Sequence, residues 1–168
     1  MAADLNRLAA AAIASGPRPV VLIDGRSGAG KTTFARELAP LLDAQLVSLD
    51  DLYPGWHGLA AGSAAVTETV LRAHDPGWSR WDWTAERPAE WHPVDPDRPI
   101  VIEGCGALSR TNRALATFGF WLELPAPERR RRALAREPGF ASHWREWAEQ
   151  ERVHAANEHP RSLADVIL

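Results

Sequence analysis

The sequence predicts an α/β fold of three layers, built on a mostly parallel sheet of about five strands, and three observations lead to it. Continuous apolar runs, typical of strands buried on both faces of a sheet, occur at residues 20–23 and 99–103. Segments with helical spacing alternate with such runs along the chain. A glycine-rich loop at residues 24–31 joins the first run to its helix. The 168 residues are expected to form one domain over residues 1–168.

The first half of the chain begins with an amphipathic helix that has Leu5, Leu8, Ala12 and Ile13 on one side. The glycine and prolines of residues 15–19 end this helix. A strand at 20–23, a helix at 32–42 and a strand at 45–49 follow. From residue 50 to residue 99 the chain is rich in proline, glycine, histidine and tryptophan, and one helix is expected near 67–74. So long an irregular stretch is usually functional. Residues 52–98 are therefore expected to form an insertion on the side where a second substrate, the acceptor, would bind.

The second half returns to regular structure. Apolar runs predict strands at 99–103 and 118–124, with a short helix near 111–116 between them. An arginine-rich helix is expected at 125–136, a further helix at 140–156 and a terminal strand at 164–168. A proline-glycine pair at 138–139 gives the arginine-rich segment a hinge, so residues 126–142 are expected to form a lid.

The composition excludes several classes of protein. The net charge is -3 and no stretch approaches the ~18 apolar residues of a membrane span, so neither nucleic acid nor a membrane is an expected partner. The single cysteine, Cys105, is expected to be a small buried residue. Because Asp4 interrupts the basic region that a signal peptide needs, we expect a cytoplasmic protein. The expected partner is a small molecule, and a homodimer stays open.

The glycine-rich loop carries the strongest motif. Residues 25–32 match G-x-x-x-x-G-K-[ST] at every fixed position, after an apolar strand and at the start of a helix. Glycines let backbone amides turn toward a phosphate, and the helix N-terminus adds its positive dipole end. The alternative is a glycine-rich turn that binds nothing. The residues expected to bind nucleotide are Gly25, Ser27, Gly28, Ala29, Gly30, Lys31, Thr32 and Thr33.

Lys31 is the only lysine among 19 basic residues. It stands where a compact ammonium must reach the β- and γ-phosphates, and the bulkier arginine would not fit the same cradle. Guanine-binding proteins with N-K-x-D and protein kinases each need a second lysine, so both classes are excluded. The dinucleotide pattern G-x-G-x-x-G is also absent.

Carboxylates follow two of the expected strands. Asp50 and Asp51 come after the second strand and Glu103 ends the third, and parallel strands place such ends at one edge of the sheet. We expect Asp50 to act as the base, with Asp51 as its alternative. Thr32, Glu103 and Asp50 are the candidates for holding Mg²⁺. The competing interpretations are a helix cap or solvated turn for the aspartates, and a buried partner of loop hydroxyls for Glu103.

The arginine-rich helix offers charges for the transferred phosphate. Arg129, Arg132 and Arg136 share one helical face, and Arg132 and Arg136 are assigned to catalysis, with Arg136 preferred because it precedes the hinge. The competing interpretation is a solvated surface.

On residues 25–33, on Asp50 to Tyr53 and on residues 102–104, the chain resembles the uridine kinase and phosphoribulokinase group of P-loop kinases, most closely its small uridine kinase-like ATP-binding members. The resemblance implies a P-loop NTPase fold. It also implies that Asp50 is the catalytic aspartate, that Tyr53 contacts the acceptor, and that Arg132 and Arg136 form the R-x-x-x-R-[DE] lid.

The sequence departs from this group where the acceptor would bind. Uridine kinases carry a phenylalanine-aspartate-histidine-proline segment there, whereas residues 77–83 are rich in tryptophan. We assign Asp82 to an acceptor hydroxyl and Trp81 and Trp83 to its ring. Five tryptophans lie between Trp56 and Trp91; they either stack an acceptor ring or only pack the segment.

The predicted activity is transfer of the γ-phosphoryl group of ATP, with Mg²⁺, to a hydroxyl of a small, nucleoside-like metabolite. One alternative is a nucleotide-binding regulatory or assembly ATPase. Another is a nucleoside monophosphate kinase, with Arg72, Arg80 and Arg87 as candidates for the second phosphate site.

Overall fold

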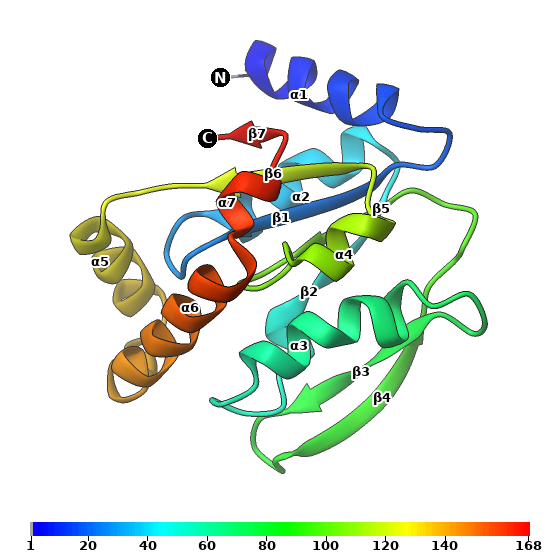
Figure 1. The fold of residues 1–168 in the computed structure, drawn as a ribbon. Helices are drawn as coiled ribbons and strands as arrows, with labels where there is room; N and C mark the ends of the chain where they lie inside the picture. Colours follow the sequence, from blue (N-terminus) through cyan, green and yellow to red (C-terminus); the bar gives the residue numbers. More distant parts are fainter. Residues whose placement is uncertain (1) are drawn as a thin grey trace.

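A sheet of five parallel strands forms the centre of the computed structural model, which describes residues 2–168 and the side chains from Asp4 onward (Figure 1). The strand order is β2-β5-β1-β6-β7. The strands are β1 Val20–Gly25, β2 Gln45–Ser48, β5 Ile100–Glu103, β6 Phe118–Leu122 and β7 Val166–Ile167. The predicted three-layer α/β fold with a five-stranded parallel sheet is confirmed.

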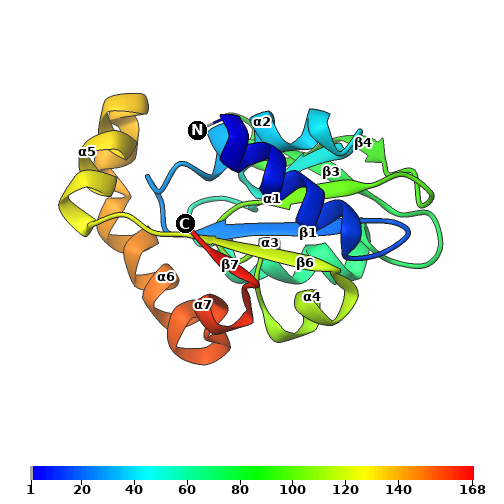
Figure 2. The ribbon, with the colours of Figure 1, turned by 90° about the horizontal axis from the view of Figure 1, so that it is seen from above.

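Helices cover both faces of the sheet. Helices α1 Ala2–Ala14 and α2 Lys31–Leu41 lie on one face (Figure 2). On the other face lie α4 Arg110–Leu115, α6 Trp144–Glu158 and α7 Pro160–Leu163, and α3 Leu59–Ala65 packs against α6. Because β1 is covered on both sides, Leu22 packs in one core cluster and its neighbours Val21 and Ile23 in the other. This double burial explains the continuous apolar run in the sequence.

The expected irregular insertion contains more regular structure than the sequence indicated. The expectation of one helix near 67–74 was wrong, because α3 begins at Leu59 and continues as a π-helical turn, Val66–Val70. An antiparallel hairpin follows, with β3 Gly77–Asp82 and β4 Arg87–Pro93. A register shift between Ser79 and Trp81 breaks its alternation, so the strand pattern was hidden in the sequence.

Several boundaries also differ from the expected ones. Helix α5, Ala126–Arg136, matches the predicted arginine-rich helix. A 3₁₀ turn, Pro138–Ser142, then occupies the start of the next predicted helix, and α6 begins only at Trp144. Ile13 was assigned to the apolar side of α1 but is 50% exposed, because Ala9 and Ala12 make the close contact instead.

All five parallel strands point the same way, so their carboxyl ends meet at one edge of the sheet. The glycine-rich loop after β1, the 3₁₀ turn Leu49–Asp51 after β2 and the end of β5 lie there. Helix α5 and the β3–β4 hairpin lie away from the sheet on different sides of the molecule (Figure 1). The fold therefore brings together the loop, the aspartates and Glu103 as expected.

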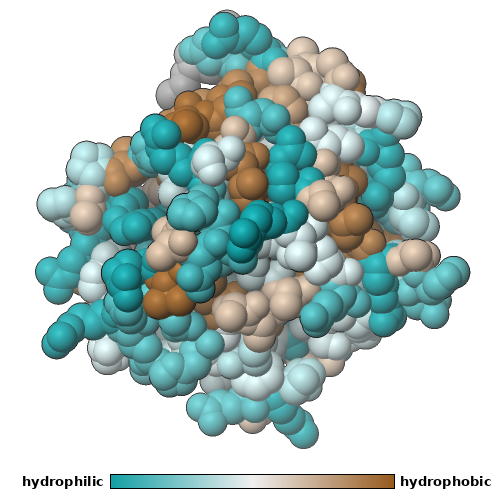
Figure 3. Space-filling view, viewed as in Figure 1, coloured by the Kyte–Doolittle hydropathy of each residue, from teal (hydrophilic) through white to brown (hydrophobic). Residues whose placement is uncertain are grey.

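The surface seen in Figure 3 is mostly hydrophilic, with apolar side chains in scattered patches. Among the described residues, no helix combines the length and the apolar character needed to cross a membrane.

Candidate active site

The loop between β1 and α2 is built to bind an anion. Gly28 and Gly30 have φ angles of 82° and 101°, which favour glycine, and a Cβ at Gly28 would overlap the carbonyl oxygen of Arg129 on α5. Helix α2 begins at Lys31 with Gly30 as its N-cap and without a side-chain cap. The first amides of a helix have no partners within it, so they are available to a phosphate.

Lys31 lies within this loop with 8% of its surface exposed. Its Nζ is 3.4 Å from the carbonyl oxygen of Arg26 and 3.3 Å from Cys105 Sγ. Burial alone would lower the pKa of Lys31, but the neighbouring Cys105, Glu103 and Asp50 raise it above its ordinary value. The ammonium is therefore charged at neutral pH.

Glu103 occupies the end of β5 and is 1% exposed. Its Oε1 accepts hydrogen bonds from Thr32 Oγ1 at 3.1 Å and Ser48 Oγ at 2.7 Å. Burial raises the pKa of this carboxyl above its ordinary value. Glu103 therefore accepts from one hydroxyl at the start of α2 and from one at the end of β2, and the charge of Lys31 opposes the shift in its pKa.

The oxygen atoms around Glu103 fit a magnesium ion. Within the described chain, no group of three or more histidine, cysteine or acidic side chains could hold a metal alone. Mg²⁺ commonly uses only one or two carboxylates, with phosphate and water oxygens completing its octahedron. Glu103, Thr32 and Asp50 line one cavity and offer that incomplete set.

Asp50 is the aspartate that the fold places between two cavities. It lies on the turn after β2, with no hydrogen bond or ion pair at its carboxylate among the described residues. The first cavity, of about 180 Å³, contains the glycine-rich loop, Arg132 and Arg136. The second, of about 460 Å³, is aromatic and shares Ser27, Asp50 and Arg136 with the first. Asp51 lines only the second cavity, so the geometry favours Asp50 as the base.

The three arginines on one face of α5 differ in role. Arg129 is 7% exposed and donates to the carbonyl oxygens of Ser27 at 3.1 Å and Leu124 at 3.1 Å. Its bond to Ser27 connects α5 to the glycine-rich loop. Arg132 and Arg136 line the first cavity, which we call the phosphate cavity. Arg132 also pairs with Glu128 at 2.7 Å.

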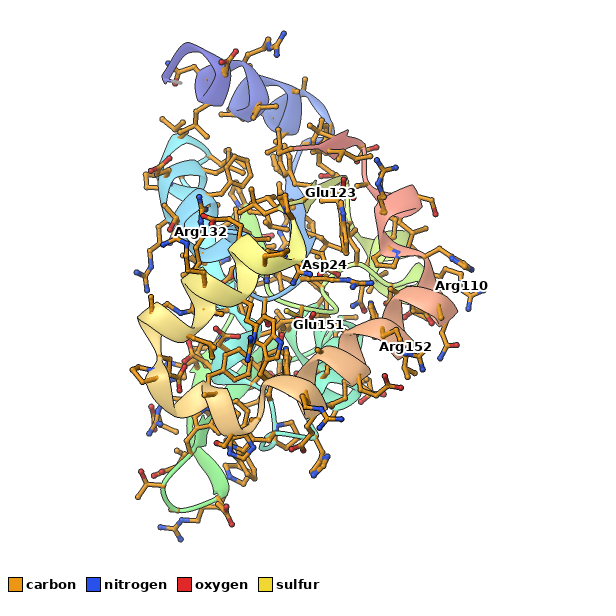
Figure 4. All side chains as sticks on the ribbon, turned by 90° about the vertical axis from the view of Figure 1, so that its left-hand side faces the viewer. Asp24, Arg110, Glu123, Arg132, Glu151 and Arg152 are labelled. Atoms are coloured by element: carbon orange, nitrogen blue, oxygen red, sulfur yellow. The ribbon has the colours of Figure 1, made fainter. Side chains whose placement is uncertain are left out.

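Two buried carboxylates at this site were not predicted from the sequence, and Figure 4 shows both near the centre of the molecule. Asp24 Oδ1 accepts the amides of Gly25 at 2.6 Å and Gly106 at 3.1 Å, and Oδ2 accepts that of Leu108 at 2.8 Å. Burial raises the pKa of Asp24 to about 6, although these hydrogen bonds and Lys31 oppose the shift. An aspartate at the end of an apolar strand was the available signal.

Glu151 is the second carboxylate. It lies on α6, is 6% exposed, and accepts the Ser27 amide at 2.7 Å and the Cys105 thiol at 3.4 Å. It follows Trp147 by one helical turn on the buried face of α6, so an acid within an apolar stripe was the signal. Cys105 is buried as expected, burial raises its pKa to about 12, and its sulfur lines the phosphate cavity.

Five aromatic side chains line the second cavity: Tyr53, Trp56, Trp83, Phe140 and Trp147. Tyr53 is 1% exposed, and its hydroxyl donates to the carbonyl oxygen of Cys105 at 2.8 Å, so its ring rather than its hydroxyl is available. Trp83 is 40% exposed, and its Nε1 donates to the carbonyl oxygen of Asp50 at 3.3 Å. Phe140 and Trp147, which belong to the buried core, also form part of the wall.

Two residues assigned to the acceptor lie outside this cavity. Asp82 accepts the amides of Thr84 and Ala85, both at 2.9 Å, and so closes the turn of its own hairpin. Trp81 precedes it on β3 and has a buried indole nitrogen without a partner. Trp83, which follows β3 in the turn of the hairpin, lines the cavity instead.

The arginines expected to form a second phosphate site also lie outside the aromatic cavity. Arg72 binds the carbonyl oxygen of Asp75 and lies over Trp91, and Arg80 pairs with Glu90. Neither these two nor Arg87 lines the aromatic cavity, where Arg136 is the one arginine among the described residues.

Comparison with solved structures finds proteins that share this fold. The chain superposes on a protein assigned as a possible uridine kinase from Bacillus stearothermophilus with a TM-score of 0.68 and 18% identity, over 98% of this chain and 96% of that one. It is similar also to a protein assigned as a fructose transport system kinase from Silicibacter sp. TM1040, with a TM-score of 0.63 and 18% identity over 98% of each chain. The expected likeness to uridine kinases is confirmed for the fold.

Similarity in sequence is confined to a shorter segment. Two tRNA dimethylallyltransferases match, from Chlamydia muridarum at 36% identity over 56 residues and from Chlamydia trachomatis at 38% over 52 residues. These segments make up 33% and 31% of this chain but only 18% and 16% of those enzymes. No family model matches the chain.

Proposed function

We propose that the protein transfers the γ-phosphoryl group of ATP to a hydroxyl of a small, ring-containing metabolite. One observation carries the proposal: Asp50 and Arg136 lie where the phosphate cavity meets the aromatic cavity. A base and a positive charge between two binding spaces are what phosphoryl transfer to a bound alcohol requires. The likeness in fold to kinases supports this proposal.

Each residue has a distinct role in this proposal. The loop amides and Lys31 hold the donor phosphates, and Arg136 and Arg132 offset the charge that spreads over the transferred group. Asp50 accepts the proton of the acceptor hydroxyl. The aromatic walls hold the acceptor ring and exclude water, which would otherwise compete as the acceptor.

Glu103, Thr32 and Asp50 are the residues that would hold Mg²⁺ in this proposal. When bound, such an ion would offset the negative charge of the donor phosphates. Ser48 donates to Glu103 Oε1 through a 2.7 Å hydrogen bond. The carboxylate is thus oriented before any ion binds.

The rival functions have weaker support. A nucleoside monophosphate kinase needs a second anion site, and Arg136 is the one arginine that lines the aromatic cavity among the described residues. The segment shared with the tRNA dimethylallyltransferases is consistent with a P-loop transferase, but it covers less than a fifth of those enzymes. A regulatory ATPase would not need a base between the two cavities.

Substitution of Asp50 tests the proposal. Asp50→Asn should reduce turnover by ~10²-fold or more, because it removes the base, while ATP binding measured by calorimetry stays nearly intact. The matched control is Asp97→Asn, on an exposed loop that lines neither cavity. ATP consumption would be followed with nucleosides, nucleoside monophosphates, sugars, vitamins and aminoglycosides. Consumption that remained at its basal level with every acceptor would favour the regulatory ATPase.

A further inference from the structure

The aromatic cavity has an unusual charge. Besides its five aromatic rings it is lined by three carboxylates, Asp50, Asp51 and Glu137, and by one cation, Arg136. The faces of aromatic rings are themselves negative, because the π-electron cloud lies above and below the ring plane. The rings and the carboxylates therefore both attract positive charge on a bound molecule.

Two of these carboxylates are not needed by the phosphate. The proposed function uses Asp50 at the acceptor hydroxyl and Arg136 at the transferred group. Asp51 and Glu137 remain, and no hydrogen bond or ion pair to a described residue engages either carboxylate. Of the cations that act on Asp51, Arg80 has the largest effect, and it is already bound to Glu90 through two hydrogen bonds of 2.5 and 3.1 Å.

The rings are arranged so that one face is available. Trp56 stacks on His143 with ring centroids 4.1 Å apart and 5° between planes, which fixes it against the turn before α6. Trp83 lies 5.0 Å from Trp56, remains 40% exposed, and is tied to the backbone of Asp50. A planar group on Trp83 would thus lie beside the carboxylates.

From this combination we propose that the phosphate acceptor is an organic cation that carries a hydroxyl group, with its positive charge on or next to a planar ring. Cations bind over indole faces by cation–π attraction, and unpaired carboxylates add a Coulomb attraction that a neutral ring does not receive. This inference rests on the proposed phosphoryl transfer. It narrows the acceptor from any ring-containing alcohol to a positively charged one.

Three alcohols of nearly equal shape test the charge directly. They are 1-methyl-3-(hydroxymethyl)pyridinium, a cation; 3-methylbenzyl alcohol, its neutral isostere; and 3-(hydroxymethyl)benzoate, an anion. Each would be titrated by calorimetry into the protein saturated with Mg²⁺ and a non-hydrolysable ATP analogue. The cation should bind about tenfold more tightly than the neutral alcohol, and the anion more weakly than both.

The carboxylates are tested with the same three compounds. Asp51→Asn combined with Glu137→Gln should bring the affinity of the cation to within about twofold of the neutral alcohol, since only the cation loses an attraction. The affinity of the neutral alcohol should stay unchanged, which also shows that the cavity is still folded. Glu68→Gln, an exposed acid that does not line the cavity, is the matched control.

A cation that binds no more tightly than its neutral isostere, or no measurable binding of any of the three, would overturn the inference. Measuring ADP release with ATP separates this failure from a failure of the proposed function. Phosphorylation of uridine or of the neutral alcohol in preference to the cation would reject the inference of a cationic acceptor but support the proposed phosphoryl transfer. Preferential binding of the cation without ADP release would keep the cation site and reject the phosphoryl transfer.

Discussion

The two cavities of the candidate active site, which the proposed function assigns to the phosphate donor and to the acceptor, are built by different means. On the donor side, one continuous segment from β1 through the loop to α2 supplies half of the lining residues, and Asp24, Lys31 and Glu103 are at most 8% exposed. On the acceptor side, the lining comes from the turn after β2, the loop before α3, the β3–β4 hairpin and the segment from α5 to α6. Its most accessible ring, Trp83, is 40% exposed.

This difference indicates where the site tolerates change. Backbone amides and buried charges on the donor side have fixed positions, and each removed partner leaves another group unsatisfied. The acceptor side presents rings and carboxylates from separate segments, so one substitution changes a contact without disturbing its neighbours. We therefore expect large effects from donor-side substitutions and graded ones from acceptor-side substitutions.

The largest effect is expected at Lys31. Lys31→Met should reduce phosphoryl transfer by ~10³-fold or more and weaken ATP binding, because no other lysine exists and the charge of the cradle is lost. Turnover and calorimetric ATP affinity measure both losses. Arg36→Met, on the exposed face of the same helix, is the control and should leave both unchanged. Near-normal turnover of the Lys31→Met variant would contradict the expectation that the donor side is more sensitive to substitution than the acceptor side.

Asp24 should show the next largest effect, on stability. Asp24→Asn should lower the free energy of unfolding by ~1–3 kcal/mol at pH 7. The NH₂ group of the new side chain would face a backbone N–H whose hydrogen bond the carboxylate accepts in the wild type. Urea unfolding followed by tryptophan fluorescence measures this change.

Asp24 also predicts a dependence of stability on pH. Its pKa is raised to about 6 in the folded protein, above the ordinary value of 3.8, so the folded state holds the proton more tightly. The resulting stabilisation is complete below about pH 4 and is lost as the pH rises through about 6. The difference in stability between the wild type and Asp24→Asn should fall over this range. A difference that grew instead would show that the hydrogen bonds outweigh burial.

Glu151 tests whether the donor loop depends on α6. Glu151→Ala removes the acceptor of the Ser27 amide and should raise the KM for ATP about tenfold, because that buried N–H loses its partner. Glu151→Gln keeps an accepting oxygen and should restore most of the affinity. Glu149→Ala, exposed on the same helix, is the control. Equal KM values in all three variants would mean that the loop holds its shape without α6.

The smallest effect is expected on the acceptor side. Trp83→Leu should raise the KM for the acceptor about fivefold and leave the KM for ATP unchanged, because it removes one stacking face. Trp91→Leu, on the same hairpin but 45% exposed outside the cavity, should change neither constant. Similar effects of the two variants would mean that the hairpin matters only as a packed unit.

The sequence predicted the donor side because its signals are local. Double burial makes β1 a continuous apolar run, and the loop pattern needs only neighbours along the chain, so the parallel sheet and the phosphate loop followed. The hairpin was missed because a register shift disrupts alternation in β3 and its faces are largely exposed. A local pattern cannot show either feature.

The contacts between distant segments required the folded structure. Glu151 reaches Ser27 across 124 positions of the sequence, and Arg129 reaches it across 102. Neither partner is marked by a motif, because each acts through one hydrogen bond that depends on how α5 and α6 pack. The same packing separated Arg129, which holds the loop, from Arg132 and Arg136, which face the cavity.

The sequence by itself determined that this protein has a parallel α/β sheet and a phosphate-binding loop with Lys31 at its centre. These features depend on apolar runs and glycine positions that are contiguous in the chain. Only the tertiary structure decided that Asp50 rather than Asp51 faces both cavities, and that Trp83 rather than Trp81 or Asp82 lines the acceptor side. The physical reason is that a side chain's direction is set by strand register and by the packing of elements far apart in sequence.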